Sequence, residues 1–91
     1  MSLIQFDPAK DATNVKKHGI SLVRFADMTD RLVAPDPGHS KLEPRWIVVG
    51  RIDQRLYVAV VTDRANQVRV ISLRPASRKE RLHYGETTTS E

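Results

Sequence analysis

Three apolar segments joined by short polar turns limit this chain to a small set of folds. They read RWIVVGRI, RLYVAVVT and QVRVISLR, at residues 45–52, 55–62 and 67–74. β-Branched residues favour strands, and connections of two to four residues allow only antiparallel neighbours. The sequence therefore predicts an antiparallel β-meander.

The middle segment of this meander indicates how the sheet is covered. Both of its alternating sets of side chains are apolar: Leu56, Val58 and Val60 on one face, and Tyr57, Ala59 and Val61 on the other. A strand with two apolar faces belongs in the centre of a sheet. We expect helices to cover one face of the sheet, which leaves the other for a partner.

The first third of the chain carries the signals of two helices. Asp7 and Pro8 are typical of a helix start and Gly19 of a helix end, which predicts a helix between them. The segment SLVRFADM, residues 21–28, places its apolar side chains on one helical face and predicts a second helix. Short strands are expected before the first helix and at residues 31–34.

The last part of the chain predicts a short helix after the meander. Pro75 ends the third strand, and Ser77 is a natural first residue for the helix. Before the meander, PDPGHSKLEP at residues 35–44 predicts a long loop. We expect one domain over residues 1–85 and a frayed tail over residues 86–91.

Charge and composition narrow the class of partner. The net charge is +4 over 91 residues, which favours a polyanion such as RNA or DNA, an acidic membrane surface or an acidic protein. The aromatic content of 5% argues against a surface built mainly on stacked bases. Without cysteines there is no disulfide framework and no thiol nucleophile. No segment predicts a signal peptide or a membrane span, so we expect a cytoplasmic protein.

Three blocks of the sequence resemble the BrnT-type toxins of type II toxin–antitoxin systems. The blocks are FDPAKDATNVKKHGIS, DPGHSKLEPRWIVVGR and VRVISLRPASRKERLHY, and their order and spacing also agree with the family. The resemblance runs from about Phe6 to Tyr84, which is nearly the whole chain. It implies an α+β fold of the RelE-like kind, with N-terminal helices packed on an antiparallel β-meander that is followed by a short C-terminal helix.

The same resemblance implies an activity and a partner. The activity is that of a ribonuclease toxin that cleaves RNA, alone or on the ribosome, and so inhibits translation. The partner is a cognate antitoxin of the BrnA-like kind, which neutralises the toxin and carries a DNA-binding part.

Departures from the family pattern keep an alternative open. The family usually has Trp where this chain has Phe6, and a smaller residue where it has Leu73, while Pro75 stiffens the junction that follows. Leu73 and Pro75 are expected to shift Arg74. The alternative is a catalytically inactive module with the same fold that binds RNA or the antitoxin. A DNA regulator is disfavoured, because neither early helix has a base-reading polar face.

Arg69 and Arg74 are the first candidates for a catalytic role. Cleavage requires a held phosphate and stabilisation of extra negative charge, and the planar guanidinium suits both tasks. On a regular strand, residues five apart point to opposite faces, so the two arginines share a site only if the strand twists or bulges. Regular alternation also places Arg69 on the face of Ile71 and Leu73.

Glu80, His39 and His18 are the candidates for proton transfer. Glu80 is either a general base or, with Ser77, one half of a capping box that closes the helix start. A histidine such as His18 can carry protons in catalysis, but His18 also lies where a helix end favours positive charge. His39 lies in the long loop, where it has fewer structural uses.

The end of the last helix offers weaker candidates. Tyr84 lies one turn after Glu80 and on the same helical face. It either donates a hydrogen bond to a phosphate or packs against Leu3 or Val68, and packing is favoured. His83 is expected to be incidental.

Basic residues on both helices are candidates for contacts with the RNA backbone. They are Lys16, Lys17, Arg78, Lys79 and Arg81. Such a cluster binds phosphates with a salt-dependent affinity, although it is also typical of a solvated helix face or of a surface for an acidic antitoxin. The histidines show no metal spacing, so neither a metal nor another cofactor is expected.

Overall fold

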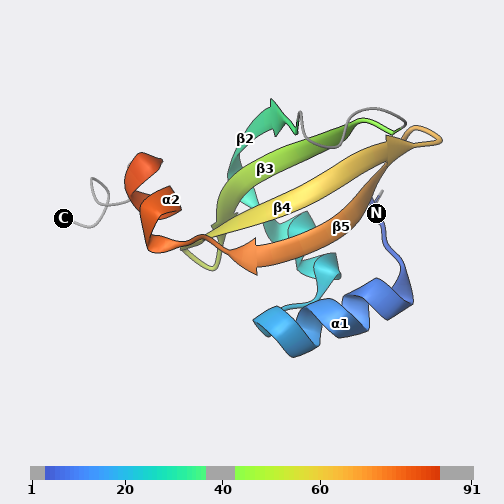
Figure 1. Ribbon diagram of the computed structural model, residues 1–91, viewed down its shortest axis with the longest axis horizontal. Helices are drawn as coiled ribbons and strands as arrows, with labels where there is room; N and C mark the ends of the chain where they lie inside the picture. The colour runs from blue at the N-terminus through green and yellow to red at the C-terminus, as the bar shows by residue number, and fades with distance from the viewer. Residues whose placement is uncertain (1–3, 37–42, 85–91) are drawn as a thin grey trace.

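The computed structural model describes residues 4–36 and 43–84 (Figure 1). The elements in chain order are β1 (Ile4–Gln5), α1 (Pro8–His18), the 3₁₀ helix η1 (Leu22–Asp27), β2 (Thr29–Pro35), β3 (Arg45–Ile52), β4 (Arg55–Arg64), β5 (Gln67–Pro75) and α2 (Arg78–His83). The fold is α+β, as the sequence predicts, and the expected tail at 86–91 lies outside the described residues.

The five strands form one mixed sheet in the order β1-β5-β4-β3-β2. The predicted meander of β3, β4 and β5 is confirmed, and β2 extends it as a further antiparallel strand. β1 pairs with β5 at the opposite edge in parallel orientation. The sheet is therefore mixed rather than purely antiparallel, because the first strand joins the last one instead of its neighbour in sequence.

Two-residue turns join the strands of the meander. Asp53 and Gln54 have φ angles of 53° and 67°, and Ala65 and Asn66 have φ angles of 54° and 65°. Positive φ at both turn residues gives a hairpin whose twist matches that of the paired strands. The second turn is shorter than the four residues predicted, because β4 continues to Arg64.

The first predicted helix is confirmed, and so are its two ends. The Asp7 carboxylate accepts a hydrogen bond of 2.8 Å from the backbone N–H of Ala9. Gly19, with a φ of 73°, donates its N–H to the carbonyl oxygen of Val15 at 2.8 Å. The second segment forms a 3₁₀ helix of 6 residues in place of the predicted α-helix. β2 begins two residues after it, so there is room only for the short turns that 3₁₀ helices favour.

The two sides of the sheet differ in their cover. α1 and η1 lie on one side, which we call the helix-covered face (Figure 1). Its buried residues include Leu22, Phe25, Val48, Ile52, Ala59, Val61, Val70 and Leu73. We call the opposite side the open face. On β3, β4 and β5 it carries the residues Arg45, Ile47, Val49, Arg51, Leu56, Val58, Val60, Thr62, Arg69, Ser72 and Arg74.

A buried asparagine fixes α1 against the edge of β5. Asn14 is 5% exposed, and its side-chain oxygen accepts a hydrogen bond of 3.1 Å from the N–H of Leu73. Its side-chain nitrogen donates to the carbonyl oxygens of Leu73, at 2.7 Å, and Ile20, at 2.9 Å. β1 pairs only with the first part of β5, so the Asn14 amide takes the place of a neighbouring strand farther along.

Candidate functional site

A β-bulge in β5 decides where the two candidate arginines lie. Arg69 is opposite Thr62 of β4, and Arg74 is opposite Val58, which puts both arginines on the open face. The pairing shifts by one residue between these positions, and Ile71 is the extra residue. The bulge is therefore the irregularity that allows Arg69 and Arg74, five residues apart, to lie on the same face. The two Cα atoms are separated by about 13 Å, from the rise of four residues along β4.

The bulge also overturns one prediction from the sequence. Regular alternation placed Arg69 on the face of Leu73, and this is wrong. Leu73 is 0% exposed and lies in the core under the helices, whereas Arg69 faces the other way. The extra residue between them reverses the alternation. The side chain of Leu73 is larger than the residue usual in the family at this position. It packs in the core and does not face Arg74.

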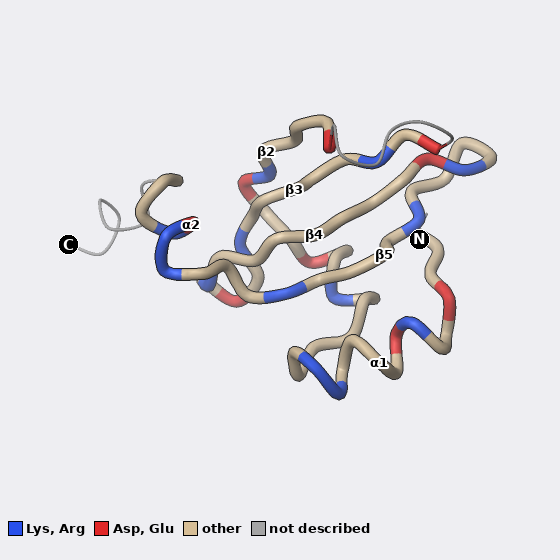
Figure 2. The backbone as a smooth tube through the Cα atoms, in the orientation of Figure 1, with Lys and Arg blue, Asp and Glu red and all other residues tan. Residues whose placement is uncertain are grey.

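Two further arginines extend the open face. Arg45 is opposite Thr62 on its β3 side, in the same row as Arg69, and Arg51 is opposite Leu56. Figure 2 shows basic residues along β5 and at the start of α2. Arg45 and Arg51 were not predicted as site residues. Their signal in the sequence was the alternation within β3, which sends positions 45, 47, 49 and 51 to one face.

Arg74 is held by a carboxylate in a two-pronged ion pair. Its two terminal nitrogens each donate to a different oxygen of Glu80, both at 2.8 Å. The hydrogen bonds from Arg74 are the largest cause that lowers the pKa of Glu80, to about 2. The same contacts raise the pKa of Arg74. A carboxylate with so low a pKa is a weak base near neutral pH.

Glu80 also closes the start of α2. It accepts a hydrogen bond of 2.7 Å from the N–H of Ser77, and its own N–H donates to the Ser77 hydroxyl at 3.1 Å. The capping box expected as the structural alternative is therefore confirmed. One carboxylate thus fixes both the helix start and the orientation of Arg74.

Arg69 has a different environment. Among the residues that the structure describes, its guanidinium has no hydrogen bond and no ion pair. Its donors are therefore available to an anion, in contrast with those of Arg74.

α2 brings two aromatic side chains to the open face. His83 and Tyr84 line a hollow over Ile47 and Val58, beside Glu80. Their rings lie 5.0 Å apart, edge to face. His83 was expected to be incidental. The sequence of this short helix gives no sign of where the helix packs, so the position of His83 on the open face could not be predicted.

The predicted packing of Tyr84 against Val68 is wrong. Val68 packs against the core of the helix-covered face, whereas Tyr84 lies on the open face near Val49 and Leu56. Leu3, the other predicted contact, lies outside the described residues. The chain crosses to the open face at Ala76, whose N–H donates to the carbonyl of Leu56 at 2.9 Å.

The comparisons with known proteins connect this geometry with a family. Residues 6–80 match the family described as ribonuclease toxin, BrnT, of type II toxin–antitoxin system. The chain belongs to the BrnT family. No curated protein and no solved structure matches it.

Membership of the BrnT family confirms the resemblance seen in the sequence. The family is one of ribonuclease toxins of type II toxin–antitoxin systems, which supports ribonuclease activity of this chain and implies an antitoxin partner. The matched stretch includes Arg69, Arg74 and Glu80 but ends before His83 and Tyr84. The rings on the open face therefore lie beyond what the BrnT family match covers.

The other predicted site residues are spread over the BrnT fold. Lys17 and His18 line a hollow between α1 and β5, together with Lys10 and Ser72. Lys16 is exposed on α1 and is not part of that hollow. His39 lies outside the described residues.

The predicted basic residues of α2 also lie in different places. Lys79 lines the open-face hollow beside Glu80, and Arg78 is exposed at the helix start. Arg81 donates a hydrogen bond of 3.2 Å to the carbonyl of Ala76. Only Lys79 of this group therefore lines the same hollow as Glu80.

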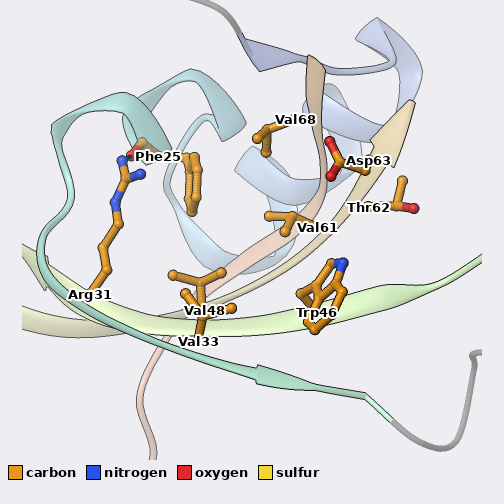
Figure 3. A pocket seen from close by; sticks show the side chains of 9 residues that line it. All are labelled: Phe25, Arg31, Val33, Trp46, Val48, Val61, Thr62, Asp63 and Val68. Atoms are coloured by element: carbon orange, nitrogen blue, oxygen red, sulfur yellow. Dashed lines mark hydrogen bonds between the residues drawn. The ribbon is translucent and has the colours of Figure 1, made fainter. Parts of the chain in front are cut away.

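The helix-covered face has an apolar hollow of its own beyond η1. Figure 3 shows Phe25, Trp46 and Val61 around it, with Arg31 and Asp63 at opposite sides. Arg31 is already used, because it donates to the carbonyl of Phe25 at 2.8 Å and lies 4.4 Å from the centre of that ring. This hollow lacks the convergent charged groups of the open face.

Within residues 4–36 and 43–84, no group of three or more histidine, aspartate or glutamate side chains is arranged to hold a metal ion. In the same part of the chain, none of the helices has the length and apolar character needed to cross a membrane.

Proposed function

We propose that this BrnT-family toxin cleaves RNA on its open face and thereby inhibits translation. The observation that carries the proposal is the bulge in β5, which brings Arg69 and Arg74 onto the face of the sheet opposite to α1 and η1. We further propose that the fold is RelE-like in its helix arrangement. The cognate antitoxin, a BrnA-like protein with a DNA-binding part, neutralises the toxin by covering the open face.

The proposed reaction is an internal phosphoryl transfer that needs no metal. The ribose 2′-oxygen forms a bond to the adjacent phosphorus, and the bond from phosphorus to the 5′-oxygen breaks. The products are a 2′,3′-cyclic phosphate and a 5′-hydroxyl end. The 2′-hydroxyl proton goes to a base, and an acid gives a proton to the leaving oxygen. The extra negative charge on the phosphate in the transition state is stabilised by guanidinium groups.

The two arginines have distinct roles in this proposal. Arg69, whose guanidinium has no partner among the described residues, binds a phosphate directly. Arg74 is oriented by Glu80 and donates a further hydrogen bond of 3.3 Å to the carbonyl of Pro75, which leaves its Nε–H and one terminal N–H for the phosphate. Glu80 is thus a positioning residue rather than the general base, because its pKa lies at about 2.

Histidines are the proposed proton carriers. His83 lies beside Glu80, and His18 lies near Ser72 at the edge of β5. His39, outside the described residues, is the third candidate. A histidine titrates close to neutral pH and therefore suits both the acid and the base role.

A second function is favoured by the tight pairing of Arg74 with Glu80. A guanidinium already held by two hydrogen bonds has fewer donors for substrate. In this alternative the chain is an inactive module that binds RNA or the antitoxin through the remaining basic residues.

An RNA cleavage assay separates the two functions. The purified chain is mixed with end-labelled single-stranded RNA and a chelator, with and without ribosomes, and cyclic phosphate ends are detected. We expect cleavage by the wild type and a loss of roughly 100-fold in kcat/KM for Arg69→Ala and for Arg74→Ala, because each removes a donor to the developing charge. Arg55→Ala is the matched control, since Arg55 is exposed on β4 beside the turn.

Each of three other outcomes of this assay would lead to a different conclusion. Binding of RNA without cleavage, and without growth arrest when the chain is expressed alone, would establish the inactive module. Cleavage that survives both arginine substitutions would place the active site elsewhere. A requirement for ribosomes would identify the substrate as RNA in translation.

A further inference from the structure

Two adjacent hollows on the open face share one aromatic residue. The first is lined by Ile47, Val49, Val58, Lys79, Glu80, His83 and Tyr84. The second is lined by Asp30, Arg31, Leu32, Val49, Arg51, Leu56 and Tyr84. Because Val49 and Tyr84 belong to both, the two hollows meet at these residues. Tyr84 is 38% exposed, so a large part of its ring is accessible at this boundary.

The first hollow combines an apolar floor with the ion pair of the proposed site. Ile47 and Val58 form the floor, and His83 forms part of the wall. Glu80, in the same wall, holds Arg74 at 2.8 Å. A group that enters this hollow therefore lies next to the guanidinium that is proposed to bind phosphate. The volume of about 340 Å³ is at the small end for a ligand pocket.

The second hollow has an apolar floor and a polar rim. Leu32, Val49 and Leu56 form its apolar floor, while Asp30 and Arg51 carry the charged groups of its rim. Leu32 is 58% exposed although it is apolar, so an occupant of this hollow would remove it from water. The volume is about 470 Å³. A flat group with apolar faces and polar atoms at its edge would fit a hollow with an apolar floor and a polar rim.

Nucleobases have these properties, and the charge of the open face favours the polymer that carries them. A base stacks through its π-face on an aromatic ring and offers donors and acceptors only at its edge. Four arginines lie on this face, at positions 45, 51, 69 and 74, so a polyanion is attracted to it. The aromatic content of 5% argues against an extended stacking surface, but the rings of His83 and Tyr84 lie together here.

We infer that the two hollows hold the bases of two neighbouring nucleotides of the RNA substrate, one on each side of Tyr84, with the phosphate between them directed at Arg74. This inference rests on the proposed function and adds the base-recognition site. Tyr84 then sets the register of the RNA in the site, because its ring separates the two bases. Glu80 and Lys79 contact the edge of one base, and Asp30 and Arg51 that of the other.

Abasic substitution in the RNA tests this inference. A short RNA with one cleavage site is prepared with the base removed from either nucleotide that flanks the cleaved bond, or from a distant nucleotide. Cleavage of each RNA is measured as kcat/KM. The affinity of each is measured on a 2′-O-methyl version that cannot be cleaved. We expect a loss of roughly tenfold in affinity for either flanking position, the size expected for one stacked base, and no loss for the distant one.

Tyr84 variants link this loss to the ring. In Tyr84→Ala, intact RNA should bind roughly tenfold more weakly, and removal of a flanking base should then have little further effect. Tyr84→Phe retains the ring and should therefore retain the loss of affinity on removal of a flanking base. Circular dichroism confirms that both variants are folded, which is expected because Tyr84 lies at the end of α2.

Several outcomes would overturn the inference. Equal affinity of the wild type for intact and flank-abasic RNA would show that the hollows hold no bases, and cleavage sensitive to Arg69 and Arg74 would still support the proposed function. Loss of antitoxin binding in Tyr84→Ala, with RNA binding unchanged, would show that a protein segment occupies the hollows. Absence of cleavage would contradict the proposed function and, because no cleaved bond would then define flanking nucleotides, also the inference that rests on it.

Discussion

On the helix-covered face, β5 contributes Val70 and Leu73, which are 1% and 0% exposed; on the open face, the same strand contributes Arg69, Ser72 and Arg74. The bulge at Ile71 lets one strand present its apolar residues to the core and its arginines to the proposed RNA site. Under the proposed function, this single strand contributes stability on one side and binding on the other. Substitutions on the two faces should therefore change different properties.

The largest expected effect is on the helix-covered face. Leu73→Ala removes a fully buried side chain, and it should lower the free energy of unfolding by about 3 kcal/mol because a cavity replaces packed atoms. Ser72→Ala, next to it on the open face, is the matched control and should change the value by no more than about 0.5 kcal/mol. Denaturant titration measures both. Equal losses for the two variants would contradict the division between the faces.

A smaller effect is expected where α1 meets the edge of β5. Asn14→Leu keeps the size of the side chain but leaves both backbone groups of Leu73 and the carbonyl of Ile20 without their partner, at a cost of about 2 kcal/mol. Amide exchange at Leu73 should become faster. Thr13→Ala on the same helix is the control, because its exposed hydroxyl donates only to the carbonyl of Ala9. Unchanged exchange in Asn14→Leu would show that another group protects the strand edge.

The open face should respond in binding rather than in stability. Arg69→Ala should reduce the salt dependence of RNA affinity, with a change of about 0.7 in the slope of log affinity against log salt concentration, if Arg69 neutralises one phosphate of a single strand. Its unfolding free energy should stay within about 0.5 kcal/mol of the wild-type value. Fluorescence anisotropy at several salt concentrations measures the slope. Arg69→Lys should keep the slope, and an unaltered slope in Arg69→Ala would remove this residue from the phosphate contacts.

The smallest expected effect belongs to the ion pair that joins β5 to α2. The pKa of Glu80 is lowered from 4.5 to about 2, so the pair stabilises the fold fully above pH 4.5 and loses this contribution as the pH falls to about 2. Glu80→Gln can still close the capping box, and it should cost about 1 kcal/mol at pH 7, because the pair is partly exposed and screened by solvent.

The pH dependence of unfolding tests the contribution of Glu80. The difference in unfolding free energy between wild type and Glu80→Gln should shrink between pH 4.5 and pH 2. A difference that stays constant over this range would mean that the charge of Glu80 contributes nothing.

Local signals in the sequence were sufficient for the parts of the fold that depend on neighbouring residues. Asp7 and Gly19 marked the ends of α1, and Ser77 with Glu80 marked the start of α2, because caps act within one helical turn. The turn at residues 53 and 54 and the order of the meander followed in the same way.

The parts that depend on distant contacts could not be predicted in this way. The bulge at Ile71 is not marked by a glycine or another local signal in the sequence. The sequence therefore predicted that Arg69 and Arg74 share a site only if the strand twists or bulges. The parallel pairing of β1 with β5 and the docking of His83 and Tyr84 on the open face are likewise decided by tertiary packing.

The contact between Asn14 and Leu73 has a consequence for how the toxin is made. The two residues are 59 positions apart, and β1 is also paired with β5, so the beginning of the chain depends on the last strand. During synthesis from the amino end, the nascent chain has neither partner until β5 has emerged from the ribosome. A product released before β5 was made would leave one edge of β4 unpaired and α1 without its contact to β5. Such a fragment would be cleared by proteases instead of poisoning the cell, and folding of the toxin would coincide with the completion of its own translation.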